Sequence, residues 1–138
     1  MMRKKTKTNA DEPVLSIGKV ATALNVHQRT LRIYDEQRLL VARRSKQNRR
    51  LYSLNDIEKG RLIQFLTRNL AINLAGVKII LKLLEVSKVK PAMYMQYIKD
   101  IAKSAKIDKK TQQYNVERLS KRGKKTGAAV IERISAKA

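Results

Sequence analysis

The chain has no cysteine and no tryptophan, and its 138 residues include one histidine, two prolines and five glycines. Without cysteine there can be no disulfide, no thiolate metal site and no thiol redox switch. The one histidine, His27, supplies too few converging ligands, so we predict no metal site. The sequence also offers no nucleophile paired with a base, no paired carboxylates and no glycine-rich phosphate loop. We therefore expect a protein that is not an enzyme and that uses no cofactor.

Long apolar runs are missing as well. The most apolar stretch, residues 73–84, is interrupted by Lys78 and Lys82 and is too short to span a bilayer as a helix. The basic segment at residues 3–7 lacks the apolar core of a secretory signal. These features predict a cytoplasmic protein with no part in the membrane.

Positive charge, by contrast, is in large excess. Lysine and arginine number 32 against 11 aspartates and glutamates, which leaves a formal net charge of +21 spread along the chain. Such a field attracts polyanions, and their binding should weaken steeply with salt because each neutralised phosphate releases counterions. Charge alone leaves three partners open, namely DNA, RNA and an anionic membrane surface. The length allows one small globular domain and an appendage.

Two short helical patterns follow each other between residues 16 and 37. Ser16 is a good N-cap for the first, whose apolar side chains recur on one face at positions 17, 20, 21 and 24. Asn25 interrupts the pattern, and a second helix from about His27 to Gln37 buries Leu31. The polar groups predicted to face outward from it are the side chains of Gln28, Arg29 and Arg32 and the hydroxyl of Tyr34. Two helices, a tight turn and a basic outer face are typical of a helix-turn-helix, whose second helix enters the major groove.

A β-hairpin is predicted directly after these helices. Residues 40–43 and 50–52 are short extended runs, and between them Asn48 tolerates the positive φ of a tight turn. Five cations are concentrated here, namely Arg43, Arg44, Lys46, Arg49 and Arg50. Because so many like charges repel one another, the cluster favours contact with phosphates or with the minor groove. A hairpin whose charges are merely solvated is the alternative.

The rest of the chain is predicted to be largely helical. Ser53 and Asp56 form a capping box that opens a third helix, and Asn73 caps a fourth. A break is expected before Pro91, where a fifth helix begins. Its apolar stripe is more typical of an oligomer or core contact than of ligand binding. The residues assigned to dimerisation are Tyr94, Tyr97, Ile98, Ile101 and Ala105.

The order and spacing of these motifs resemble the MerR family of bacterial transcription regulators. The matching segments are residues 16–21, 26–34, 50–53 with 56–57, and 73–81, and the resemblance covers about residues 13–85. Segment 73–81, with Val26 and His27, is more similar to the heat-shock repressor subgroup, HspR, than to metal-sensing or drug-sensing members. Four positions depart from the family pattern, with Gln28 and Ala42 in place of proline and Arg38 and Asn48 in place of glycine.

The resemblance implies a mainly α fold, in which a winged helix-turn-helix head with a small β-hairpin wing precedes a C-terminal helical dimerisation and tail region. It implies a homodimer in the bacterial nucleoid that binds an inverted-repeat operator in double-stranded DNA and represses heat-shock and chaperone genes. A chaperone co-regulator of the DnaK or GroE type is implied as a further partner. The alternative is a basic structural or RNA-associated protein, which is less favoured because RNA readers usually expose aromatic residues for stacking.

The expected division of the chain is a flexible basic arm at residues 1–12, a DNA-binding domain at 13–85, a helical dimerisation region at 91–122 and a basic, partly disordered tail at 123–138. Gln28 and Arg29 are placed to read base edges, since Gln can pair with adenine and Arg with guanine. The resemblance assigns phosphate contacts to Arg32 and Tyr34, whereas Tyr52 is either a phosphate contact or a packing residue. The full predicted DNA-binding set is His27, Gln28, Arg29, Thr30, Arg32, Tyr34, Arg43, Arg44, Lys46, Arg49, Arg50 and Tyr52.

Overall fold

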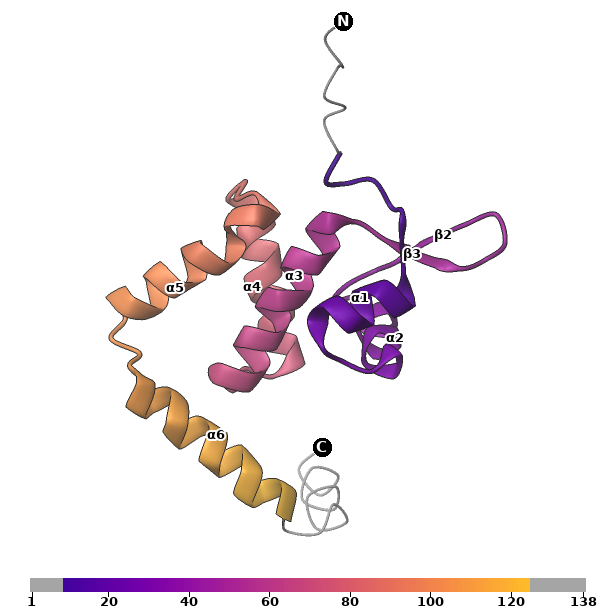
Figure 1. The fold of residues 1–138 in the computed structure, drawn as a ribbon. Coiled ribbons are helices and arrows are strands. Elements are labelled where there is room, and N and C mark those ends of the chain that lie inside the picture. The colour runs from indigo at the N-terminus through magenta and orange to yellow at the C-terminus, as the bar shows by residue number, and fades with distance from the viewer. Residues whose placement is uncertain (1–8, 125–138) are drawn as a thin grey trace, which may run out of the picture.

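The computed structural model describes residues 9–124, so most of the predicted arm (1–8) and most of the predicted tail (125–138) lie outside the described residues. The fold is mainly helical, as expected, with one small sheet (Figure 1). The elements in chain order are β1 (Leu15–Ser16), α1 (Ile17–Leu24), α2 (Gln28–Glu36), β2 (Arg43–Arg44), β3 (Arg50–Tyr52), α3 (Leu54–Gln64), the π-helix η1 (Phe65–Asn69), α4 (Leu74–Val86), the 3-10 helix η2 (Pro91–Met93), α5 (Tyr94–Ser104) and α6 (Lys109–Lys124).

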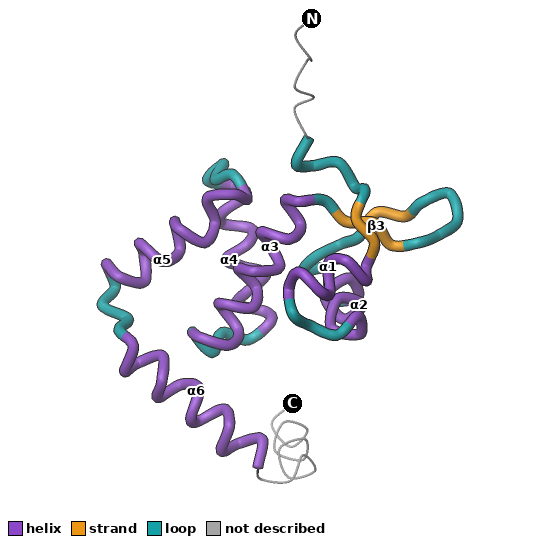
Figure 2. The backbone as a smooth tube through the Cα atoms, in the orientation of Figure 1, coloured by secondary structure: helices purple, strands orange, loops and turns teal. Residues whose placement is uncertain are grey.

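The sheet is antiparallel and has the order β1-β3-β2. The predicted hairpin is its β2–β3 part, in which Arg44 lies opposite Arg50. The third strand, β1, was not predicted, and it places Leu15 opposite Tyr52. Because β1 leads directly into α1, this pairing joins the base of the hairpin to the helix-turn-helix (Figure 2).

Three predicted helix starts are confirmed by their caps. The Ser16 hydroxyl accepts a hydrogen bond from the Lys19 N–H at 3.3 Å. Ser53 and Asp56 form the expected capping box, in which each side chain accepts from the other residue's backbone N–H. The Asn73 side chain caps α4 by accepting from the Gly76 N–H at 2.8 Å. Polar side chains thus satisfy N–H groups that have no partner within their helix.

Several helix ends place a residue other than glycine in the left-handed region. Asn25, Lys88 and Lys106 do so with φ of 52°, 56° and 57°. Arg38, at the position where the resembled family usually has glycine, has a φ of 57° and therefore accepts the left-handed conformation. This conformation costs a residue with a Cβ about 1–2 kcal/mol more than it costs glycine. Asn48 has a φ of 61° and is the turn residue of the hairpin, as predicted.

A single core holds these elements together. It joins α1 and α2 through Val20 and Leu31 to α3 through Leu62, and Tyr52 of β3 also lies inside it. Helix α5 packs against α3, and its inward residues Tyr94 and Ile98 extend the core. The head on the right of Figure 1 and the helices α4 and α5 on its left are therefore parts of one packed unit around α3.

Both ends of the described part of the chain have local structure, a turn at residues 9–12 and the helices α5 and α6. Residues 9–12 form a turn held against the start of α3, where the Asn55 N–H donates to the Ala10 carbonyl at 3.0 Å and the Asn55 side chain donates to Asp11 at 2.6 Å. Within the region 91–122, η2 leads into α5, which ends at Ser104, and α6 begins at Lys109 and runs to Lys124. Within the described residues, no helix combines the length and the apolar character that a membrane crossing needs.

Candidate nucleic-acid interface

The start of α2 presents an exposed polar surface. His27 is its N-cap residue, with an extended backbone and no capping hydrogen bond from its side chain. The side chains of His27, Gln28, Arg29 and Arg32 are exposed, and Thr30 is half-buried. Arg32 donates to the Gln28 amide oxygen at 3.5 Å. The first turn of α2 therefore has the free donors and acceptors that reading base edges requires.

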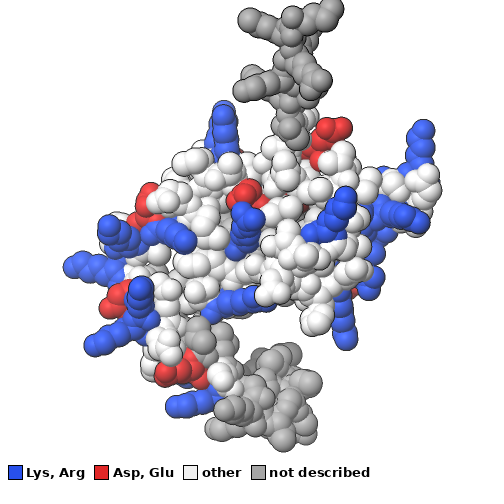
Figure 3. Space-filling model, in the orientation of Figure 1, with Lys and Arg blue, Asp and Glu red and all other residues white. Residues whose placement is uncertain are grey.

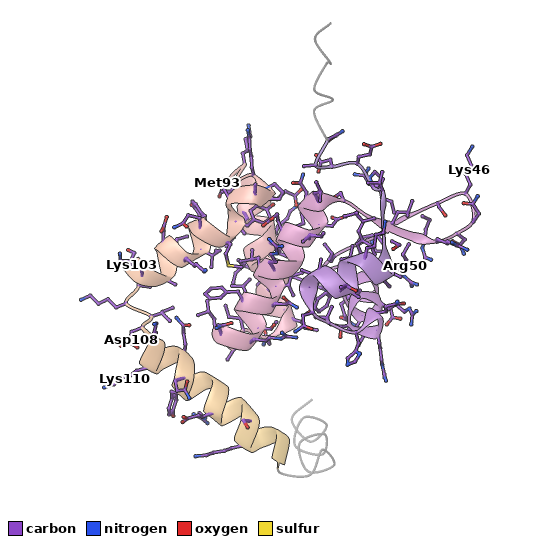
Figure 4. The ribbon with its side chains drawn as sticks, in the orientation of Figure 1. Lys46, Arg50, Met93, Lys103, Asp108 and Lys110 are labelled. Carbon is purple, nitrogen blue, oxygen red and sulfur yellow. The ribbon has the colours of Figure 1, made fainter. Side chains whose placement is uncertain are left out.

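The hairpin formed by β2 and β3, which we call the wing, carries exposed cations. Arg43, Arg44, Lys46 and Arg49 are all exposed. Lys46 projects from the tip, and blue side chains gather over the wing in the space-filling view (Figures 3 and 4). Hydrogen bonds across the turn hold its shape, among them one from the Arg44 guanidinium to the Asn48 carbonyl at 3.2 Å. The wing is thus an ordered and cationic projection beside α2.

A basic cleft of about 450 Å³ lies between α1, α2 and the wing. The cations that line it are Lys19, Arg32, Arg44, Arg49 and Arg50, and none of the described acidic residues lines it. A concave surface lined by charges of one sign concentrates its field and attracts anions. The cleft therefore suits the phosphate backbone of a nucleic acid that passes between α2, the recognition helix of the helix-turn-helix, and the wing.

Arg50 has a different role from the other wing cations. It is half-buried, and its Nε donates to Asp35 of α2 at 3.0 Å. The side chains are 23% and 16% exposed, so water screens this ion pair less than one at the surface. Figure 4 shows Arg50 at the base of the wing, beside the helix-turn-helix. The ion pair thus connects the wing to α2, and Asp35 largely neutralises the charge of Arg50 in the free protein.

Both tyrosines of the predicted set belong to the core. Tyr34 is 8% exposed and its ring packs in the core, while the phosphate contact expected of its hydroxyl stays a prediction. Tyr52 is fully buried and is a packing residue. Burial raises the pKa of Tyr34, while the nearby Arg68 lowers it to a smaller extent. Burial also raises the pKa of Tyr52, and the neighbouring carboxylates, Asp35 first, raise it further. The hydroxyl of Tyr52 is buried and has no hydrogen-bond partner among the described residues.

Two cations beside this surface are absent from the predicted set. Lys19 lines the basic cleft from the first turn of α1. Its position three residues after the Ser16 cap, on the polar side of α1, is a signal that could have identified it. Arg68, in η1, is exposed and lies close enough to α2 to affect Tyr34. No local pattern places Arg68 there, because its position depends on how α3 and η1 pack against the head.

The residues assigned to dimerisation fall into two groups. Tyr94 and Ile98 are buried against the core of their own chain, and Ile98 also lines an apolar groove, so their part in a dimer contact stays a prediction. Tyr97 and Ile101 of α5 and its C-cap residue Ala105 are exposed. Tyr97 and Ile101 border the same apolar groove, of about 440 Å³, that also takes side chains from η1 and α4.

The exposed apolar surface continues from this groove onto α4. Ile79, Leu83 and Val86 lie at helical spacing and are 62%, 59% and 67% exposed. Isolated apolar side chains on a surface are ordinary, whereas a continuous patch of them indicates an interaction site.

The described residues contain no group of three or more histidine, cysteine, aspartate or glutamate side chains arranged to hold a metal ion. The only ion pairs among them are Arg50–Asp35, Arg61–Glu58 and Lys82–Glu85. Cations at the cleft and the wing other than Arg50 therefore lack a carboxylate partner within the described residues.

Comparisons with known proteins agree with this geometry. The model of the MerR HTH family regulatory proteins matches residues 15–84, which are β1 to α4. A heat shock protein HspR from Streptomyces coelicolor is 41% identical over 73 residues, which are 53% of this chain and 48% of that relative. HTH-type transcriptional regulators GlnR from Bacillus anthracis and Bacillus cereus are each 33% identical over 92 residues, 67% of this chain and 70% of theirs. The chain thus spans about half the length of the HspR relative.

Proposed function

Because the chain belongs to the MerR family of helix-turn-helix regulatory proteins, which are transcription regulators and not enzymes, we propose that it is a homodimeric repressor that binds an inverted-repeat operator and acts on heat-shock and chaperone genes. The basic cleft is the observation that carries this proposal. It brings Arg32 of the recognition helix together with Arg44 and Arg49 of the wing, around a space that no carboxylate borders. Phosphates held in the cleft would set the register of α2 in the major groove.

Base recognition is assigned to the first turn of α2. Gln28 and Arg29 are exposed there, and each can form two hydrogen bonds with one base. Arg43 and Lys46, exposed on the wing, would contact phosphates or the adjacent minor groove. His27 and Thr30 flank the recognition residues and complete the proposed contact surface. Arg50 would orient the wing through Asp35.

The proposed dimer follows from the number of bases that one chain can read. One short helix contacts too few base pairs for useful discrimination, whereas two helices related by a twofold axis read two half-sites at a set spacing. The occupant we propose for the exposed apolar surface of α4 and α5 is a second copy of this chain. Leu83, Tyr97 and Ile101 are its central contacts, because they are large, apolar and exposed.

The target genes are proposed from the HspR relative. The aligned 73 residues are 53% of this chain and are 41% identical. That relative is named a heat shock protein, so we propose stress genes as the targets and, by the same resemblance, a chaperone of the DnaK or GroE type as co-regulator. The nucleoid is the proposed site of action.

Genome-wide mapping of bound sites tests this function. The expected result is a shared inverted repeat upstream of chaperone genes, with half-sites one helical turn or a multiple apart. Binding to this repeat, measured by fluorescence anisotropy, should exceed binding to a scrambled duplex. Occupancy without a common motif, or equal affinity for RNA and scrambled DNA, would instead favour a basic structural or RNA-associated protein.

A further inference from the structure

A second cationic concavity, of about 410 Å³, lies on a different part of the molecule from the basic cleft. It is bordered by the end of α2, by α3, by α4 and by the start of α5, and none of its lining residues lines the basic cleft. Its polar lining consists of Arg38, Lys59, Lys78, Lys82, Glu85 and Tyr94. None of these residues belongs to the proposed recognition surface, so the concavity is separate from it.

Four cations surround this space and only one carboxylate accompanies them. Lys82 lies 3.7 Å from Glu85, and both side chains are 70% exposed, so that contact is weak. Arg38, Lys59 and Lys78 have no carboxylate partner among the described residues. The cations come from three separate parts of the chain, so no single helical charge pattern accounts for their convergence. Their mutual repulsion is relieved when an anion occupies the centre.

We propose that this concavity is an anion site for a small ligand that carries two or more phosphate groups. Its volume is in the range of small-molecule sites, about 300–1,000 Å³. Arg38 can grip a phosphate with two parallel N–H donors, while the lysines act as point charges. Apolar side chains of Leu39 and Leu81 form part of its lining and limit hydration on one side.

The phosphates, and not an attached base, carry the recognition. Tyr94 is the one aromatic residue in the lining, and it is 4% exposed, so its ring offers no open face for stacking. A nucleoside triphosphate should therefore bind no more tightly than inorganic tripolyphosphate. Tighter binding of the nucleotide would contradict this assignment.

Amide chemical shifts of the full chain, followed during titration with inorganic tripolyphosphate, test the site. The amide chemical shifts of residues around Lys59 and Lys78 should change along a saturating binding curve, distinct from the curve of the wing residues. Replacing both residues in Lys59→Gln/Lys78→Gln should weaken this curve about tenfold, and Lys59→Arg/Lys78→Arg should restore most of the affinity.

The matched control, Arg44→Gln/Arg49→Gln, removes the same charge from the basic cleft. It should weaken the response of the wing and change the curve around Lys59 by less than about twofold. Absence of a response around Lys59 and Lys78 would overturn the proposal. It would also be overturned if either pair of substitutions weakened both curves equally, because only the net charge would then matter.

The same titration with duplex DNA in place of tripolyphosphate completes the test. It should shift the wing amides and leave Lys59 and Lys78 unperturbed, whereas perturbation of these two lysines would assign the concavity to the DNA interface and refute a separate site. This test needs no operator sequence, so it is independent of whether the chain represses heat-shock genes.

Discussion

Replacing Tyr52 with phenylalanine should stabilise the protein and leave DNA binding unchanged. The side chain is fully buried, and its hydroxyl has no hydrogen-bond partner among the described residues. Burial and the nearby Asp35 both raise the pKa of this hydroxyl, so it is neutral at pH 7. An unsatisfied buried polar group costs about 1–3 kcal/mol. Phenylalanine keeps the ring and removes that cost.

The expected gain in the free energy of unfolding is at the low end of this range, about 1 kcal/mol. For a domain of this size, 1 kcal/mol corresponds to a rise in Tm of about 4 °C. Urea denaturation followed by circular dichroism measures the first quantity and a reversible thermal scan the second. Tyr52→Ala is the control for packing, and it should destabilise the protein by about 3–5 kcal/mol because it leaves a cavity.

Two results would refute this reasoning. A Tyr52→Phe variant less stable than the parent would mean that the hydroxyl makes a hydrogen bond in solution. A folded variant with weaker duplex binding would mean that the hydroxyl reaches a phosphate, as the alternative expectation from the sequence holds.

Three further predictions follow from the helix ends, the wing and the apolar face. Lys88→Gly should raise the free energy of unfolding by about 0.5–1 kcal/mol, because glycine adopts the φ of 56° at this position without steric cost. The control Lys90→Gly, at a φ of −73°, should not raise it. Equal effects of the two substitutions in urea denaturation would contradict this account. Arg49→Ala should reduce the magnitude of the slope of log affinity for DNA against log salt concentration by about 0.9, since one phosphate contact is lost. An unchanged slope in anisotropy titrations would show that Arg49 does not contact DNA. If the chain forms the proposed dimer, Ile101→Glu should convert it to folded monomers in sedimentation experiments, because the substitution puts a charge into the exposed apolar surface. A dimer that persists would place the contact elsewhere, and Ser104→Glu, beyond the groove lining, is the control.

Much of the fold was predictable because its signals are local. Caps at Ser16, Ser53 and Asn73 depend on residues within three or four positions, so the helix starts could be read from the sequence. The turn at Asn48 is a property of one residue type. The strand β1 could not be predicted, because two residues carry no periodicity and form a strand only when β3 lies beside them.

The candidate site was predictable only in part. Arg29 and Arg32 of α2 and the wing cations other than Arg50 are exposed as expected, since charge alone disfavours their burial. Tyrosine is compatible with either environment, so Tyr34 and Tyr52 were ambiguous. Likewise, Tyr94 and Ile98 share an apolar stripe with Tyr97 and Ile101, and the stripe does not reveal which side faces α3.

Sequence by itself determined the helical elements, the positive charge and the residues at the start of the recognition helix, because caps, periodicity and charge act between near neighbours. Tertiary structure alone decided that Arg50 is held by Asp35, fifteen positions away, and that Arg38, Lys59 and Lys78 surround one concavity. Such convergence depends on how α2, α3 and α4 pack around a shared core, and packing is a property of the whole chain that no local spacing encodes.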